Sequence, residues 1–252
     1  MQSVSAKSVQ VDEDESSACL FKELASRVSA LGASIGVRII PFKNPSLPFF
    51  SALESQKKQR IITNLKNFIE ICEATIAEGH SLRDSKSLVW KAIKYFGLRP
   101  PSDLFNFVEN EEVVEIYETD NYQAFRNFRF FELCSYSLEQ IYSIPWTELW
   151  YRDEEAMAGM IEFIGQCLGS DQTKTAAIHK PTHKITELAS PFKFELNYKT
   201  KGIAPLWDNS SGQKAGFVII SVGEILNQIS ASEEERKLLE YSKNERPSLQ
   251  LL

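Results

Sequence analysis

The adjacent prolines Pro100 and Pro101 divide the chain into two parts with different hydrophobic periods. Before them, apolar residues recur every three or four positions, which predicts amphipathic helices. After them, apolar residues alternate with polar ones or form short β-branched runs, which predicts strands. Because proline cannot continue a helix, the prolines and the change of period mark the same boundary. The sequence therefore predicts an α+β protein.

Residues 51–100 are predicted to form a hairpin of two antiparallel helices. Gly79 and Gly97 follow the two helices and are natural stops for them. A lone hairpin cannot hide an apolar stripe, so the next domain or a second copy of the chain has to cover it. We expect a homodimer built on the stripe of the first helix, which consists of Ile61, Leu65, Phe68 and Cys72.

The chain before this hairpin is expected to be less regular. Residues 1–18 are polar and acidic, which predicts a disordered tail. Residues 19–50 predict a short helix followed by an irregular connector with several prolines. No apolar run reaches the ~20 residues of a membrane span, and the N-terminus lacks the layout of a secretory signal. We therefore expect no membrane association.

The second part of the chain is predicted to contain strands separated by helices. Residues 113–117 and 122–125 are rich in β-branched and aromatic side chains, which is typical of short strands. A longer helix is expected over residues 153–169, with an aspartate as its N-cap and a glycine at its end. Strict alternation over residues 192–198 and a continuous apolar run over 215–222 predict two more strands.

Seven residues of this part are spaced as in a known domain family. They are Asn127, Phe130, Leu133, Tyr136, Ser137, Glu139 and Ile141, in the pattern N-x-x-F-x-x-L-x-x-Y-S-x-E-x-I. This pattern, and the order of strands, short helices, longer helix and strands, resemble the PAS domain over residues 111–230. The resemblance implies an antiparallel sheet flanked by short helices. Two departures are Ser135, where the family usually has glycine, and residues 179–190, where no strand is evident.

PAS domains either bind a small molecule between the sheet and the helices or use the same fold for protein contacts. The resemblance places a ligand pocket among Phe125, Asn127, Phe130, Leu133, Tyr136, Trp146, Phe194 and Phe217. Aromatic side chains line ligand pockets, but they also fill the core of a small domain completely. The sequence leaves both alternatives open and does not identify a ligand.

No cofactor or metal is predicted. Trp146 stands at or near the position where a flavin-binding PAS domain has its reactive cysteine, so a flavin adduct is not expected there. His179 and His183 are four residues apart, but Pro181 lies between them and no further ligand residues accompany them. We interpret both as loop residues. Cys134 is expected to be a buried structural thiol.

Several classes of function are not expected. The sequence has no G-x-S-x-G, no H-E-x-x-H and no phosphate-binding glycine loop, so catalysis is not predicted. A net charge of −6 without a dominant basic cluster argues against nucleic-acid binding. Four widely spaced cysteines favour a reducing compartment, so we expect a cytoplasmic protein.

The sequence thus predicts a non-enzymatic sensory or regulatory protein that acts through an unknown protein signalling partner. A short C-terminal helix beginning near Ser232, within the tail of residues 231–252, is expected to carry the output. Gly223 is expected to be the flexible point before that helix. The alternative is an adaptor that only assembles a protein complex and binds no ligand.

Overall fold

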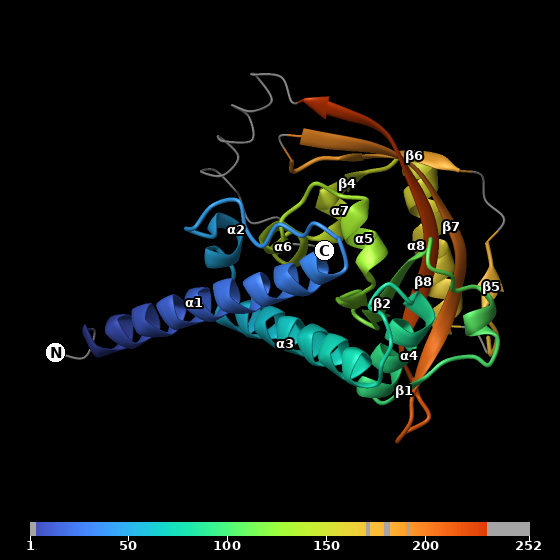
Figure 1. Cartoon of the computed structure of the whole chain (residues 1–252), viewed down its shortest axis with the longest axis horizontal. Helices are drawn as coiled ribbons and strands as arrows, with labels where there is room; N and C mark the ends of the chain where they lie inside the picture. The colour runs from blue at the N-terminus through green and yellow to red at the C-terminus, as the bar shows by residue number, and fades with distance from the viewer. Residues whose placement is uncertain (1–3, 170–171, 179–181, 191, 231–252) are drawn as a thin grey trace.

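The computed structural model describes residues 4–169, 172–178, 182–190 and 192–230, which have an α+β fold (Figure 1). The helices are α1 (Val4–Ser34), α2 (Pro48–Ser51), α3 (Ser55–Ala77), α4 (Ser85–Tyr95), the 3₁₀ helix η1 (Leu104–Asn106), α5 (Phe128–Glu132), α6 (Leu138–Ser143), α7 (Trp146–Leu149) and α8 (Glu154–Gly169). The strands are β1 (Leu98–Arg99), β2 (Val113–Glu118), β3 (Gln123–Arg126), β4 (Trp150–Tyr151), β5 (Ala176–Ala177), β6 (His183–Glu187), β7 (Phe192–Asp208) and β8 (Lys214–Ser230). Among the helices of the described residues, none is long and apolar enough to cross a bilayer.

The strands form one antiparallel sheet in the order β3-β2-β8-β7-β6-β4, and β1 and β5 pair with other parts of β7. Strands β7 and β8, each of 17 residues, form its long hairpin (Figure 1). In the turn between them, the Asp208 carboxylate accepts hydrogen bonds from the backbone N–H groups of Ser210 and Ser211, and Gly212 has a φ of 69°. Pro205 lies between the segments of β7 that pair with β5 and with β1, so its missing N–H interrupts neither pairing.

Side chains alternate between the two faces of the sheet, and each face packs against a different group of helices. Val114 and Ile116 of β2 belong to the larger hydrophobic core, together with residues of α1, α3 and α4. Tyr117, Phe217 and Ile219 belong to a smaller core with residues of α8. The sheet therefore lies between an N-terminal helical layer and α8 (Figure 1).

The N-terminal helices pack on one another and on the edge of the sheet. Helix α1 packs along α3, and α3 contacts both α4 and β3 (Figure 1). Phe68 of α3 is the centre of an aromatic cluster, with ring centroids 5.7 Å from Phe125, 5.6 Å from Phe128 and 6.1 Å from Phe131. This cluster joins the helical layer to β3 and α5.

The burial of the α3 stripe removes the reason given for a homodimer. Ile61, Leu65, Phe68 and Cys72 are at most 2% exposed, because the rest of the same chain packs around them. The cover comes from the same chain: α1, which precedes the hairpin, packs along α3, and residues of β3 and α5 pack against Phe68. Homodimerisation stays a prediction, but this stripe no longer supports it.

Helix α1 begins much earlier than the sequence predicted. Residues 4–18 were expected in a disordered tail, but they belong to α1. No glycine or proline occurs before Gly32, so nothing in the backbone stops the helix from extending towards the N-terminus. A polar composition argues against burial, but it does not exclude a helix.

Two strands also differ from expectation. Strand β6 lies where no strand was evident, since only Ile185 and Glu187 of its five residues are buried and no apolar run marks it. Strand β8 continues past Gly223, which pairs with Tyr198, so this glycine is part of the sheet and not a flexible point. The helix expected after Ser232 lies outside the described residues.

Candidate ligand-binding site

A small cavity lies between the sheet and the helices α5, α7 and α8. Its volume is about 50 Å³, compared with the ~10–15 Å³ that one buried water requires. The sheet contributes Glu115, Tyr117 and Phe217 to its wall, and the helices contribute Leu133 and Ile164. The wall is therefore mostly apolar and aromatic, with a few polar groups, as is usual for ligand sites.

A second cavity of about 190 Å³ adjoins the first, beneath α8. Met160, Ile164 and Ile219 line both cavities, so these three side chains form the boundary between them. Phe163 and Ile203 are among the apolar residues that line the second cavity. Asp153, Glu155 and His183 also line the second cavity, so the space in the direction of α8 has both apolar and polar walls.

Glu115 is a buried acid in the wall of the first cavity, with only 7% of its surface exposed. It is two residues before Tyr117 on β2, so both side chains leave the same face of the sheet. Its Oε1 accepts hydrogen bonds from the Tyr117 hydroxyl at 3.1 Å and from the side-chain amide of Gln123. Burial raises the pKa of Glu115, and this outweighs the opposite effect of the nearby Arg126 and Arg152.

Arg126 of β3 is a buried cation, with 2% of its surface exposed. It is paired in register with Glu115 across β2 and β3. Its guanidinium lies 4.8 Å from the ring centroid of Phe130 and 4.9 Å from that of Tyr142, both within the range of cation–π contacts. Among the described residues, its Nε and Nη1 atoms have no hydrogen-bond partner.

Arg152, between β4 and α8, lines the wall of the cavity, whereas Arg126 does not. Its guanidinium lies 5.7 Å from the ring centroid of Trp146 and 5.8 Å from that of Tyr198. Its Nε and Nη1 are also buried without a hydrogen-bond partner in the part of the chain that the structure describes. The charges of both guanidinium groups favour the ionised form of Glu115.

Four of the residues that the PAS resemblance assigned to a pocket line this cavity: Phe130, Leu133, Trp146 and Phe217. Phe130 and Leu133 come from α5 and its C-cap, and Trp146 is the first residue of α7. Phe217 pairs with Tyr117 across β8 and β2, and the two rings stack with centroids 5.2 Å apart. The spacing of the motif therefore accounts for Phe130 and Leu133, while Trp146 and Phe217 come from parts of the chain outside the motif.

The other four predicted residues lie outside the cavity. Phe125 is on the opposite face of the sheet, where it packs against Phe68. The Tyr136 hydroxyl donates to a backbone carbonyl at the end of α7 and accepts from two backbone N–H groups after β6. Phe194 is partly buried against the larger core, and Asn127 is a structural residue at the start of α5.

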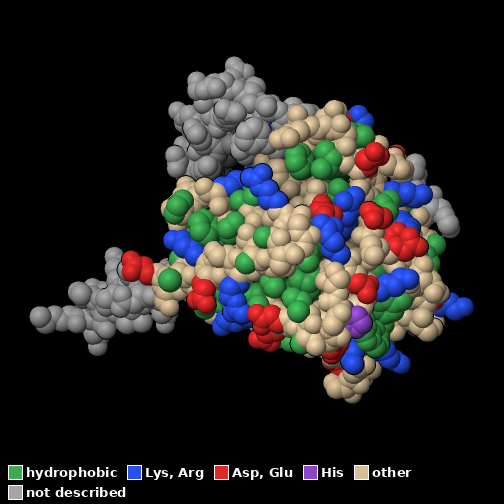
Figure 2. Space-filling view, viewed as in Figure 1, with side chains coloured by type: hydrophobic (Ala, Val, Ile, Leu, Met, Phe, Trp, Pro, Cys, Tyr) green, Lys and Arg blue, Asp and Glu red, His purple; other side chains and the backbone are tan. Residues whose placement is uncertain are grey.

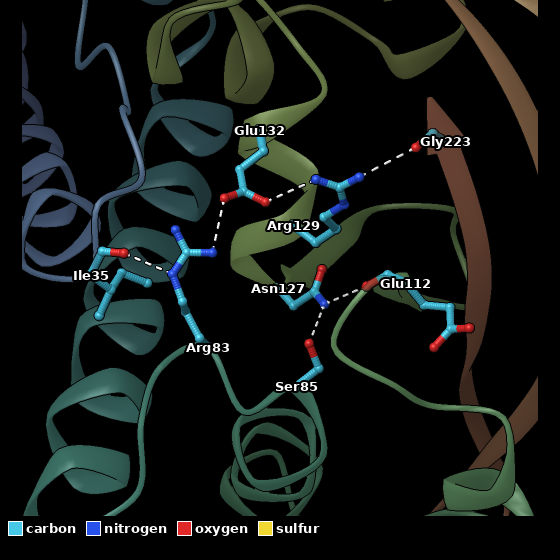
Figure 3. A network of polar contacts seen from close by, with 8 residues as sticks. All are labelled: Ile35, Arg83, Ser85, Glu112, Asn127, Arg129, Glu132 and Gly223. Carbon is cyan, nitrogen blue, oxygen red and sulfur yellow. Dashed lines mark hydrogen bonds and ion pairs between the residues drawn. The ribbon is translucent and has the colours of Figure 1, made fainter. Parts of the chain in front are cut away.

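Asn127 ties α4 and the β2 region together (Figure 3). Its Oδ1 accepts a hydrogen bond from the backbone N–H of Val114 at 3.1 Å. Its Nδ2 donates to the backbone carbonyl of Glu112 at 2.8 Å and to the Ser85 hydroxyl at 3.0 Å. The residue is 1% exposed, so these buried polar groups depend on Asn127 for their hydrogen bonds.

Five further residues connect the helical layer with the sheet, and we call them the junction (Figure 3). Arg83 donates to the carbonyl of Ile35 at 2.8 Å and to Glu132 at 3.1 Å. The other carboxylate oxygen of Glu132 accepts from Arg129 at 3.1 Å, and Arg129 also donates to the carbonyl of Gly223 at 3.5 Å. The junction thus joins the end of α1, the loop before α4, helix α5 and strand β8.

Sequence reasoning did not find Glu115, Arg126 or Arg152. A usable signal was the charge inside the short apolar strand Val113–Tyr117, because Glu115 has to share a face with the two end residues of that segment. A charged side chain on a buried face needs a partner or a function. Arg152 gives no comparable signal, because it lies in a short connection between two elements.

The described residues give no sign of a metal centre, and Cys134 lies where its thiol is unreactive. No three His, Cys, Asp or Glu side chains among them gather in an arrangement that holds a metal ion. Burial raises the pKa of Cys134 to about 12, which keeps this thiol protonated and unreactive.

On the face shown in Figure 2, Lys and Arg side chains are interspersed with Asp and Glu side chains.

Comparison with known proteins does not assign the chain to a family. No family model and no curated protein matches it. The cavity, the charged residues Glu115, Arg126 and Arg152, and the junction therefore carry the functional argument.

Proposed function

We propose that this protein is a non-enzymatic regulatory protein whose PAS-like domain senses a small ligand or a partner and transmits the change through flanking helices. One observation carries the proposal: a cavity lies on one face of a sheet whose other face is covered by helices, and its wall contains Arg152, whose Nε and Nη1 are buried without a hydrogen-bond partner among the described residues. Apolar residues fill space at lower cost, because a buried and unpaired charge destabilises the folded state.

The order of elements along the chain also supports a PAS-like domain. From β2 onwards it is two strands, short helices, the longer helix α8 and then three strands, apart from the two-residue strands β4 and β5. This is the order that the resemblance implies. Two residues of the motif, Phe130 and Leu133, line the cavity. Two others form hydrogen bonds that stabilise the fold: Asn127 with β2, and Tyr136 with the loop after β6.

Helix α5 is the element through which the cavity contacts the helical layer. Phe130 and Leu133 of its C-terminal part line the cavity, while Phe128 and Phe131 pack against Phe68 of α3. The same helix carries Arg129 and Glu132 of the junction. A change in the cavity that moves α5 therefore has a direct physical route to α1, α3 and α4.

The proposal is tested by filling the cavity from α8 with the substitution Ile164→Trp, as a substitute for a bound ligand. Hydrogen exchange of the full chain is then measured in residues 35–40 and 83–96, on the other face of the sheet. We expect the exchange rates of these segments to change. The matched control is Ile161→Trp on the same helix, because Ile161 is 58% exposed and does not line the cavity.

Native mass spectrometry of the purified full chain is the second measurement. A small molecule that co-purifies and that Ile164→Trp displaces supports the sensory function. Equal exchange in the two tryptophan variants, together with the mass of the bare chain, contradicts it. That pair of results favours the alternative below.

The alternative is an adaptor that uses the same fold only for protein contacts. The small volume of the first cavity, about 50 Å³, favours this alternative. So do exposed aromatic side chains on α4: Trp90 is 46% exposed and Tyr95 is 41% exposed. Replacing both with polar residues abolishes complex formation in an adaptor and leaves ligand binding by the cavity unchanged in a sensor.

A further inference from the structure

We infer that the open edge of strand β8 is a dimer interface, at which two copies of this chain pair as antiparallel strands and join their sheets. The inference goes beyond the proposed function and does not depend on the cavity. It follows from the backbone pairing of β8, from the side chains along its open edge and from the sequence that follows the strand.

The backbone pairing leaves one side of β8 open along its C-terminal part. Strand β2 pairs with residues 216–221 of β8, whereas β7 pairs with β8 as far as Ser230. From Val222 onwards β8 therefore has a neighbouring strand on one side only, as far as the described residues extend. Figure 1 shows this end of β8 at the outside of the fold. The backbone groups of such an edge are a template on which another strand can pair.

Few features protect this edge from pairing with another chain. Residues 222–230 contain no lysine and no proline, and Glu224 is their only charged residue. One bulge is present, because Ile225 pairs with Leu196 while Asn227 pairs with Glu195. The side chain of Ile225 is 39% exposed. Natural edge strands are usually blocked by charges or prolines, so an edge with an exposed isoleucine and a single charge is typical of an interface.

The edge is complementary to itself. Glu224 pairs with Asn197 and Asn227 pairs with Glu195, and because residues 195 and 197 share a face of the sheet, Glu224 and Asn227 share one too. A two-fold axis at Ile225 places the two copies of this isoleucine opposite each other. The same axis places each Glu224 carboxylate opposite the side-chain amide of Asn227 in the second copy. The pairing thus covers an exposed apolar side chain and gives each carboxylate a hydrogen-bond donor.

A second copy suits the edge better than the C-terminal segment of the same chain. A tight hairpin back onto β8 would require residues 233–240 as its strand, and six of these eight residues are charged. Charged residues are depleted in strands. A peptide from another protein would not require an edge that is complementary to itself, whereas a two-fold dimer does.

Sedimentation velocity of the full chain tests the inference. We expect dimers at about 100 μM that dissociate at about 1 μM, because an interface of one strand pair is small. Ile225→Lys should be monomeric at about 100 μM, since a lysine at the edge prevents pairing. The matched control is Ile161→Lys on α8, because Ile161 is also exposed, and this variant should dimerise normally. A wild-type chain that is monomeric at about 100 μM, or an Ile225→Lys variant that remains dimeric, overturns the inference.

A disulfide cross-link locates the two-fold axis. Cys19→Ser first removes an exposed native thiol. In this background, Ile225→Cys should form a disulfide between two chains on mild oxidation, because opposed residues of antiparallel strands have their Cα atoms ~4.5–5.5 Å apart. Ile161→Cys in the same background is the control and should not cross-link. Electrophoresis without reducing agent measures both. A dimeric Ile225→Cys variant that does not cross-link contradicts pairing at this axis.

Hydrogen exchange at two concentrations distinguishes a second copy from other occupants, and it needs no variant. Exchange in residues 222–230 should be slower at about 100 μM than at about 1 μM, because dimerisation follows mass action. Residues 216–221, which have strands on both sides, should exchange equally at both concentrations. Slow exchange of residues 222–230 at both concentrations in a monomeric chain would show that the chain covers its own edge. Fast exchange at both would show that the edge stays open, and either result overturns the inference.

Discussion

A Cβ atom added to Gly223 of β8 would lie 2.8 Å from Cδ1 of Leu133, at the end of α5. Leu133 lines the cavity, and the carbonyl of Gly223 belongs to the junction through its hydrogen bond with Arg129. The wall of the cavity and the junction therefore meet at one point of β8. A residue with a Cβ atom at position 223 would require the side chain of Leu133 to shift.

The first prediction follows from this contact. In Gly223→Ala, the new methyl group should displace the buried side chain of Leu133, and with it α5, away from β8. We expect the free energy of unfolding to fall by about 1–3 kcal/mol. Urea denaturation measures this change, and hydrogen exchange should become faster in residues 128–133.

Gly165 of α8 provides the matched control. A Cβ atom at this position would meet nothing within 4 Å, and the residue is exposed. Gly165→Ala should therefore raise the free energy of unfolding by about 0.5–1 kcal/mol through its better helix propensity. Equal changes in the free energy of unfolding for the two substitutions would show that the close contact with Leu133 does not affect stability.

The second prediction concerns the pH dependence of stability. The pKa of Glu115 is raised above its ordinary value of 4.5, mainly by burial, so its ionisation is harder in the folded than in the unfolded chain. The contribution of this carboxyl group to stability is therefore complete below pH 4.5 and is lost as the pH rises through its raised pKa. The charged groups that affect its pKa are Arg126 and Arg152, and Tyr117 and Tyr198 also face it.

Glu115→Gln removes this ionisation without removing the observed hydrogen bonds, because both donors reach a single oxygen of Glu115. We expect the variant to gain stability relative to the wild type as the pH rises from about 5 to about 8. Urea denaturation over this range measures the difference. Glu224→Gln on the exposed part of β8 is the control and should follow the wild type. Parallel curves for Glu115→Gln and the wild type would contradict the raised pKa.

The sequence predicts much of the fold, because each helix or strand has a buried face and an exposed face, and these two faces set the spacing of its apolar residues. The helices α3, α4 and α8 and the strands β2 and β3 lie close to where the apolar spacing places them. Strand β6 was missed because a strand with only two buried residues leaves a weak pattern. The N-terminal extension of α1 was missed because polarity and disorder were treated as equivalent.

The site was predicted only in part, for a physical reason. Phe130 and Leu133 follow from the spacing of the motif, and Trp146 and Phe217 from the wider resemblance to the PAS domain. The three charged residues depend on tertiary structure: Arg126 meets Glu115 only through the β2–β3 register, and Arg152 reaches Glu115 from the segment before α8. A pattern along one strand cannot specify a partner that lies on another element.

The third prediction concerns Asn127, which completes the hydrogen bonds of buried backbone groups. Asn127→Ala leaves the N–H of Val114 and the carbonyl of Glu112 without their side-chain partner. We expect the free energy of unfolding to fall by about 2–4 kcal/mol, because each buried unsatisfied group costs ~1–3 kcal/mol. Thermal or urea denaturation measures it. In the control Asn209→Ala, the exposed bond to the carbonyl of Leu98 is lost at a cost of about 0.5 kcal/mol or less. A similarly small loss in Asn127→Ala would mean that water replaces its hydrogen bonds.

The last prediction separates the signalling role of the junction from its stability. Glu132 accepts hydrogen bonds from Arg83 and Arg129 with different oxygens, so Glu132→Gln replaces one of the two acceptors with a donor. Both ion pairs are partly exposed, and their loss should lower the free energy of unfolding by only about 1 kcal/mol. The link between α5 and the loop before α4 should nevertheless be broken.

We therefore expect Glu132→Gln to reduce the effect of Ile164→Trp on hydrogen exchange in residues 35–40 and 83–96. The matched control is Glu73→Gln, which breaks the exposed ion pair between Arg27 of α1 and Glu73 of α3 but leaves α5 untouched. That control should preserve the full effect of the cavity-filling substitution. If the effect persists equally in both double variants, the change is not transmitted through Glu132, and the aromatic contacts of Phe68 with Phe128 and Phe131 are the remaining route.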